Sequence, residues 1–122
     1  MNTVNYRQRM TFFKENEEQF RLFLDEAQAS FTEGESEAPV NGYSYTGDEA
    51  DGSTLIAAKD VNNGNMRGKF ISGLIRKRYS QDEVEAIILN GTQSAEHAQE
   101  MADLQAYREE CKQKVDDLLS RQ

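Results

Sequence analysis

Side chains that could support catalysis are few in this sequence. One histidine, His97, and one cysteine, Cys111, occur among 122 residues. An imidazole acts as a general base only where other polar groups converge on it, whereas His97 stands near the start of an expected amphipathic helix. Cys111 stands on the apolar side of the same helix, and a reactive thiol needs a more exposed, electropositive setting. We therefore expect no catalytic residue and no enzyme activity.

The sequence also lacks a recognisable cofactor or metal motif. Gly68-Lys69 resembles the end of a phosphate-binding loop, but Phe70 stands where Ser or Thr would bind magnesium. The acidic, glycine-containing segments 48–52 and 60–64 do not supply the alternating oxygen ligands and final Glu of a calcium loop. A single cysteine excludes a cysteine-based zinc site within one chain. We expect no cofactor and no bound metal.

Charge is unevenly distributed along the chain. The formal net charge is -8, yet residues 59–79 carry six bases and one acid, and they lie between acidic arms at 1–58 and 80–122. The basic segment could meet an acidic arm of the same chain or of another copy, or all these charges could simply be solvated. Because exposed pairs add little stability, this asymmetry concerns association and partner choice more than the fold.

The basic segment could also contact nucleic acid. Basic side chains bind phosphates and aromatic rings stack on bases, and here the basic residues are followed by Tyr79. The candidate contacts are Arg67, Lys69, Arg76, Lys77 and Arg78. Because the whole chain is acidic, nucleic acid ranks as an alternative behind a protein partner. A further alternative is an acidic protein that mimics nucleic acid.

An apolar pattern near the N-terminus predicts a long helix. Eight residues from Tyr6 to Phe31 follow one another in alternating steps of four and three, and seven of them are apolar or aromatic. Such a stripe is typical of an amphipathic helix. The pattern predicts a helix over about 5–31, ~40 Å long, which would need a partner along most of its length.

The C-terminal region repeats this pattern. Its apolar side predicts a helix over about 95–120, again ~40 Å long. Ser94 is a suitable N-cap, and Glu96 lies in the first turn, where the helix dipole favours a negative charge. The predicted seam contains Met101, Leu104, Arg108, Cys111, Val115 and Leu118.

Each predicted long helix has one charged residue near the middle of its seam, Glu17 in the first and Arg108 in the second. In an antiparallel pair with aligned centres, the two would meet and would set the register. Alternatively, the aliphatic part of each side chain could pack in the seam while its charged group extends into solvent. A parallel dimer of the chain is a further alternative. The predicted contact residues are Phe13, Glu17, Phe20, Leu24, Met101, Leu104, Arg108, Val115 and Leu118.

The middle of the chain predicts two shorter helices and a small β excursion. A capping box at Ser80–Glu83 begins a helix over about 81–90, with Val84, Ile87 and Ile88 as its apolar face. Helical spacing also predicts a helix over about 66–78. Five of the eight glycines lie within 32–65, which predicts a small sheet within 38–65 or a mobile segment.

Three short stretches carry a resemblance to a known group of proteins: LIRKRYS at 74–80, DEVEAI at 82–87 and YREECK at 107–112. Through them, residues 66–119 resemble small uncharacterised proteins encoded beside structural genes of tailed bacteriophages and prophages. The resemblance implies a bacterial or phage origin, a cytoplasmic location and a role in particle assembly or tail structure. It brings no catalytic residue with it.

These observations predict one α+β, mostly helical domain spanning 1–122. We expect a non-enzymatic interaction or assembly protein that acts through helical apolar seams, with a protein partner or further copies of itself. No stretch approaches 18 apolar residues and the first residues lack the apolar region of a signal peptide, so we expect a cytoplasmic protein without membrane contact.

Overall fold

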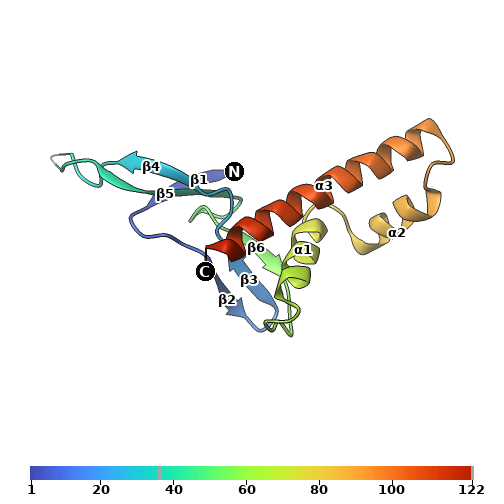
Figure 1. Cartoon of the computed structure of the whole chain (residues 1–122), viewed down its shortest axis with the longest axis horizontal. Coiled ribbons are helices and arrows are strands. Elements are labelled where there is room, and N and C mark those ends of the chain that lie inside the picture. Colours follow the sequence, from blue (N-terminus) through green and yellow to red (C-terminus); the bar gives the residue numbers. More distant parts are fainter. Residues whose placement is uncertain (36, 122) are drawn as a thin grey trace. The chain divides into compact units, whose positions relative to one another are not determined.

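The structure is a computed structural model that describes residues 1–35 and 37–121 (Figure 1). Within these residues, six strands precede three helices. The strands are β1 (Asn2–Tyr6), β2 (Phe12–Asn16), β3 (Gln19–Leu22), β4 (Ala27–Phe31), β5 (Val40–Gly47) and β6 (Thr54–Ala57). The helices are α1 (Met66–Arg76), α2 (Gln81–Asn90) and α3 (Ala95–Ser120). The fold is therefore α+β with a β-rich N-terminal half.

The strands form two three-stranded antiparallel sheets. β5 lies between β1 and β4 in one sheet, and β3 lies between β2 and β6 in the other. β2 and β3 are joined by a tight turn in which Asn16 pairs with Gln19. The Asn16 side-chain oxygen accepts a hydrogen bond from the Glu18 backbone N–H at 2.9 Å. Asn favours such turns because its side chain replaces a backbone acceptor.

The prediction of a mostly helical fold with a helix over 5–31 is wrong, because this segment forms β1 to β4. The burial pattern shows the reason. In β3, Phe20 and Leu22 are buried while Gln19 and Arg21 are only partly so, which is the period of two expected of a strand. Short strands separated by turns happened to place apolar residues at helix-like intervals. Cross-strand packing of aromatic residues then outweighed the local pattern.

The predicted pairing of Glu17 with Arg108 loses its basis once the N-terminal helix is absent. Glu17 lies in the exposed β2–β3 turn, where its carboxylate is 3.0 Å from Lys14 Nζ. Arg108 lies on an exposed side of α3. Phe13 is 46% exposed on β2, whereas Phe20 is buried on β3. The apolar residues between Tyr6 and Phe31, which were predicted to form one side of a helix, are thus distributed over strands and turns.

The three helices predicted in the C-terminal half are present. The capping box of α2 is complete: Ser80 Oγ accepts from the Glu83 backbone N–H at 3.1 Å, and the Glu83 carboxylate accepts from the Ser80 N–H at 3.2 Å. α1 ends at Arg76, two residues before the predicted end, and α3 has the predicted bounds. Strands also occur within 38–65, but they belong to the two sheets rather than to a separate excursion.

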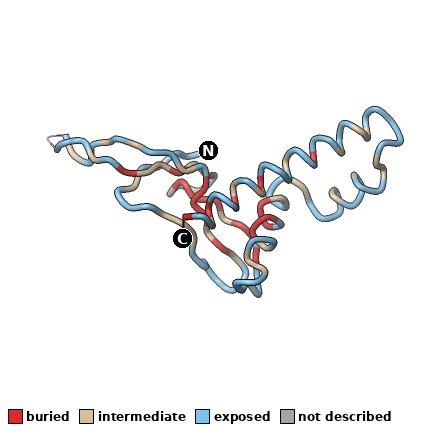
Figure 2. The backbone as a smooth tube through the Cα atoms, in the orientation of Figure 1, coloured by how far each residue is buried: buried red, intermediate tan, exposed pale blue. Residues whose placement is uncertain are grey.

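The chain divides into two compact units. One comprises Met1–Asp60 with the residues from Asp117 onward, and the other comprises Val61–Asp116. We call the first the sheet unit and the second the helical unit. Buried residues gather on both sheets and, in the helical unit, on α1 and the later part of α3 (Figure 2). No helix in the described residues has both the length and the apolar character needed to cross a membrane.

Candidate interaction surface

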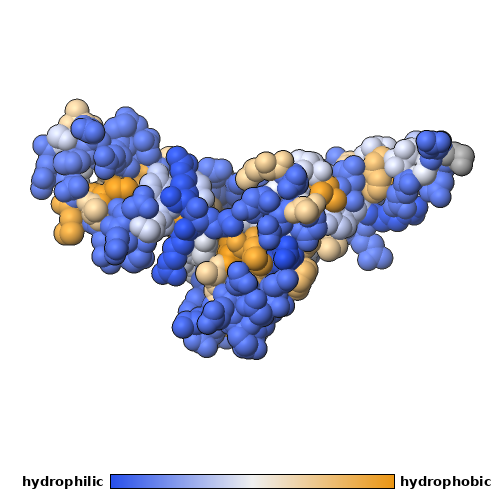
Figure 3. All heavy atoms as spheres, turned by 180° about the vertical axis from the view of Figure 1, so that it is seen from behind, coloured by the Kyte–Doolittle hydropathy of each residue, from blue (hydrophilic) through white to orange (hydrophobic). Residues whose placement is uncertain are grey.

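Helix α2 leaves much of its apolar side chain area exposed. None of its ten residues is buried. Ile88 is 50% exposed and Leu89 is 79% exposed, while Val84 and Ile87 are half-buried. Seen from behind, apolar residues are visible in the part of the helical unit that contains α2 (Figure 3). Single exposed apolar residues are common, but several on one short helix form a surface suited to a partner.

A hollow lies between α2 and the first half of α3, on the side of α2 that carries Ile87 and faces away from Leu89. The hollow has a volume of about 390 Å³ and is lined by Tyr79, Glu83, Ala86, Ile87, Glu100 and Asp103. Apolar side chains from α2 therefore lie beside carboxylates from both helices. An apolar centre with a polar rim is the usual composition of a protein interface.

A second hollow of the helical unit lies near the start of α2. It has a volume of about 180 Å³ and is lined by Ser72, Ile75, Arg76, Gln81, Val84 and Arg108. Helical spacing places Ile88 on the same side of α2 as Gln81 and Val84, because residues three, four and seven apart share a face. This side therefore presents an apolar strip with two arginines at one end.

The helical unit separates its charges along the chain. Residues 61–81 contain five bases and no acid, whereas residues 82–103 contain six acids and no Lys or Arg. The acids are Asp82, Glu83, Glu85, Glu96, Glu100 and Asp103. None of these six carboxylates forms an ion pair among the described residues. The acidic part of the unit is therefore open to a basic partner.

Arg67 and Arg78, which belong to the predicted nucleic-acid contacts, have partners inside the helical unit. Arg67 binds Asp116 with two hydrogen bonds, of 2.7 and 3.1 Å. The Arg78 guanidinium lies over the rings of Tyr79 and Tyr107, 5.5 and 4.9 Å from their centroids. Such stacking fixes a cation on an aromatic face. Of the remaining three, Arg76 and Lys77 are exposed and Lys69 is half-buried.

Tyr107 connects α3 to α1 and borders the only cysteine of the sequence. Its hydroxyl donates to the Leu74 carbonyl oxygen at 3.2 Å. Burial raises the pKa of Tyr107 to about 12, and burial also raises the pKa of the Cys111 thiol. Because the thiolate is disfavoured, Cys111 has the properties of a packed apolar residue rather than of a nucleophile.

His97 is half-buried near the start of α3. It lies in the first turn of α3, where its backbone N–H donates to Ser94 Oγ at 3.1 Å. Its Nδ1 is buried and has no hydrogen-bond partner in the described part of the chain. Across those same residues, no group of three or more His, Cys, Asp or Glu side chains is placed to hold a metal ion.

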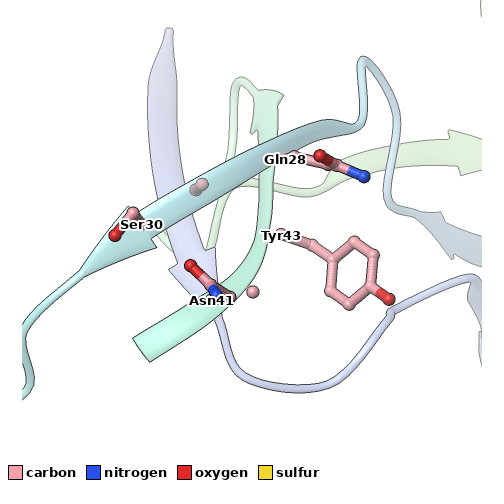
Figure 4. Close-up of a pocket in the computed structure, with 6 residues that line it drawn as sticks. Gln28, Ser30, Asn41 and Tyr43 are labelled. Carbon is pink, nitrogen blue, oxygen red and sulfur yellow. The ribbon is translucent and has the colours of Figure 1, made fainter. Parts of the chain in front are cut away.

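Concave surfaces also occur among the described residues of the sheet unit. One, of about 480 Å³, lies on β4 and β5 and is lined by uncharged residues, among them Gln28 and Tyr43, whose side chains project to the same side of the strand pair (Figure 4). Another surrounds Arg21, which bonds to Glu15 at 3.0 Å and to Ser53 at 2.9 Å. The Arg21 side chain is therefore held by its own neighbours.

The predicted contact residues of α3 are unequally accessible. Leu104, Val115 and Leu118 are almost completely buried within the single chain, Met101 is half-buried and Arg108 is exposed.

Comparison with protein families, curated proteins and solved structures found no match.

Sequence reasoning identified the apolar face of α2 but not its exposure, and it left out Leu89. A usable signal was present. Ile87, Ile88 and Leu89 are consecutive, and three successive helical residues point in directions about 100° apart. One packed side of a short helix cannot cover all three, so such a run predicts an exposed apolar residue.

Proposed function

We propose that the protein is a non-enzymatic interaction or assembly protein whose partner binds the surface formed by α2 and the first half of α3. The exposure of Ile88 and Leu89 on a helix without a buried residue carries this proposal. Burying apolar area against a partner contributes about 25 cal/mol per Å². A ten-residue helix is also marginal by itself in water, so a partner would stabilise α2.

The composition of the surface supports a protein partner. The expected resemblance of residues 66–119 to small uncharacterised proteins encoded beside structural genes of tailed phages would agree with a role in particle assembly and with a cytoplasmic location, and we include both in the proposal. The hollow beside α2 combines Ile87 with the carboxylates of Glu83, Glu100 and Asp103, which suits a partner carrying both apolar and basic groups. Nucleic acid receives less support, because Arg67 and Arg78 already have partners in the helical unit.

Quantitative co-purification from the native host tests the proposal. The tagged wild type is compared with Leu89→Lys and with Thr32→Lys, which adds the same charge at an exposed position of the sheet unit. We expect a specific partner to fall at least tenfold with Leu89→Lys, about 1.4 kcal/mol of binding free energy, and to be retained with Thr32→Lys. Partners that bind both variants equally would contradict the proposal.

A salt titration separates the nucleic-acid alternative. Binding through Arg76 and Lys77 to a fluorescent single-stranded oligonucleotide would weaken steeply with added salt, because phosphate contacts release counterions. Under the proposed function we expect no salt-sensitive binding to such a probe. Tight binding that is lost in the double variant Arg76→Gln/Lys77→Gln would favour the alternative.

A further inference from the structure

We propose that the concave surface of about 480 Å³ on β4 and β5 is a binding site for a neutral saccharide. This surface belongs to the sheet unit, whereas the α2 surface belongs to the helical unit, so the inference goes beyond the proposed function. It is carried by an uncharged lining, a held aromatic ring and a group of polar side chains that no described residue engages.

The sheet that contains this surface carries no charged side chain on its strands. No residue of β1, β4 or β5 is Asp, Glu, Lys or Arg, although these four residue types make up 30% of the chain. An ionic ligand bound here would lose hydration without gaining a counter-charge from the lining. The lining therefore favours a ligand that is polar but neutral.

Four polar side chains share one face of the β4–β5 pair. Gln28 lies opposite Tyr43 and Ser30 lies opposite Asn41 in the antiparallel register, and alternate residues of a strand point to the same face. All four line the concave surface (Figure 4). Their side chains form no hydrogen bond with another described residue, so their donors and acceptors are available to a ligand.

This group of side chains offers the hydrogen-bonding chemistry that a saccharide requires. The amide of Gln28 or Asn41 presents a donor and an acceptor next to each other, and the hydroxyls of Ser30 and Tyr43 each act as both. Neighbouring hydroxyls of a sugar ring are also donors and acceptors, so one amide can bind two of them. An apolar ligand would instead leave these groups without partners.

Tyr43 supplies an aromatic ring for the apolar face of a sugar. The Arg9 guanidinium lies 5.8 Å from the centroid of this ring, and Arg9 donates to the Glu26 carboxylate at 2.7 and 3.0 Å. Arg9 therefore holds the ring while Glu26 balances its charge. Tyr43 is only half-buried and no other described ring or cation packs on it, which leaves its opposite face for the C–H groups of a pyranose.

The strand pair fixes the floor of the site. Ala29 lies opposite Gly42, and both face away from the polar side chains because residues alternate along a strand. On that other face, a Cβ at Gly42 would overlap the Tyr6 carbonyl oxygen and crowd the Phe31 ring, so the space there is already filled. A site on such paired strands is preorganised, which reduces the entropy lost on binding.

An added peptide strand is the other occupant that a sheet can take. Such a strand would pair with the backbone of β4 along the outer edge of the sheet, since β4 is an edge strand and β5 is the central one. The concave surface instead spans β4 and β5 and is bordered by Tyr43 of the central strand. A saccharide, unlike an added strand, uses this ring and the amides together.

An array of neutral and sialylated oligosaccharides tests the class of ligand. We expect the tagged protein to bind at least one neutral glycan. It should bind the sialylated counterpart of that glycan more weakly, because no cationic side chain lines the surface. Binding to no neutral glycan, or a preference for sialylated ones, would overturn the inference. The co-purification of a host protein through Leu89 is independent of either result.

Calorimetric titration of variants with the neutral glycan bound best on the array locates the site. Tyr43→Ala should weaken binding at least tenfold, about 1.4 kcal/mol, and Gln28→Ala should weaken it about 2- to 10-fold through the lost hydrogen bond. Gln105→Ala, which removes an exposed amide from α3, is the matched control and should bind as the wild type does.

Circular dichroism verifies that each variant folds. If Tyr43→Ala does not fold, the comparison of Gln28→Ala with Gln105→Ala decides the outcome, because both positions are exposed. Equal affinities of the wild type and the folded Tyr43→Ala variant would overturn the inference, and so would equal effects of the two Gln variants.

Discussion

Arg121 donates a hydrogen bond from Nη1 to the backbone carbonyl of Phe23 at 2.7 Å, although 98 positions separate the two residues in the sequence. The same nitrogen lies 3.1 Å from the Met10 carbonyl oxygen, and Nη2 bonds to Asp117 at 2.8 Å. The Arg121 side chain has no exposed area. These contacts hold the C-terminal end of the chain in the sheet unit.

The variant Arg121→Met should destabilise the sheet unit. It removes a buried cation and leaves the carbonyl groups of Met10 and Phe23 without this donor. Breaking a buried charged network costs about 3–5 kcal/mol. Urea unfolding followed by circular dichroism measures the loss. Arg7→Met, which removes an exposed ion pair with Glu33, is the control and should change the free energy of unfolding far less; equal effects would contradict the assigned role.

Stability should fall at low pH partly through Glu26. The hydrogen bond from Arg9 lowers the pKa of the Glu26 carboxyl in the folded state, and its bond with Tyr45 lowers it further. A lowered pKa contributes stability above the unfolded-state value, and that contribution is lost as pH falls through the folded-state value. In urea titrations between about pH 3 and 7, Glu26→Gln should be less stable near neutrality and less sensitive to acid. An unchanged acid dependence would contradict this.

Stability should also fall at high pH through Tyr45. Its hydroxyl donates to Glu26 at 2.7 Å and accepts from the Met10 N–H at 2.8 Å, and burial raises its pKa to about 12. A raised pKa contributes stability below the unfolded-state value, which is lost as pH rises toward the folded-state value. Tyr45→Phe should cost about 1–3 kcal/mol near neutrality, because the Met10 N–H is left without its acceptor. It should also flatten the loss between about pH 10 and 12, and a steep loss retained in the variant would assign it to another group.

Cys111 should react slowly with thiol reagents in the native protein. Its side chain is 2% exposed, and the raised pKa disfavours the reactive thiolate. Modification must then await local opening, so labelling in buffer should be at least about 100-fold slower than in denaturant. The double variant Cys111→Ser/Thr32→Cys, with an exposed thiol on the sheet unit, is the control. Rapid labelling of native Cys111 would show that the later part of α3 opens readily.

Two glycines should respond oppositely to alanine. A Cβ at Gly47 on β5 would overlap the Ser53 backbone carbonyl, whereas a Cβ at Gly68 on α1 would meet nothing within 4 Å. Overpacking at the first site should cost about 1–3 kcal/mol. At the second, alanine should add about 1 kcal/mol through its better helix propensity. Thermal unfolding of the two variants measures both effects, and effects of the same sign would contradict the assigned packing.

The helices α2 and α3 could be predicted because their signals are local. Ser80 and Glu83 cap α2 within one turn, and the apolar spacing of α3 can be recognised within its own 26 residues. Interactions three or four residues apart decide both helices. The antiparallel sheets were not predictable in this way, because β1 pairs with β5, placing Val4 opposite Tyr45. The local spacing from Tyr6 to Phe31 also matched a helix by coincidence.

The sequence alone determined the positions of α1, α2 and α3 and the separation of charge within 61–103, because both follow from the order of neighbouring residues. Only the tertiary structure decided which apolar residues are hidden. Phe20, predicted for a helix seam, is buried on a strand, while Ile88 and Leu89 stay exposed and Arg121 is enclosed. Burial depends on which distant segments pack around a side chain, and this packing cannot be predicted from the spacing of neighbouring residues.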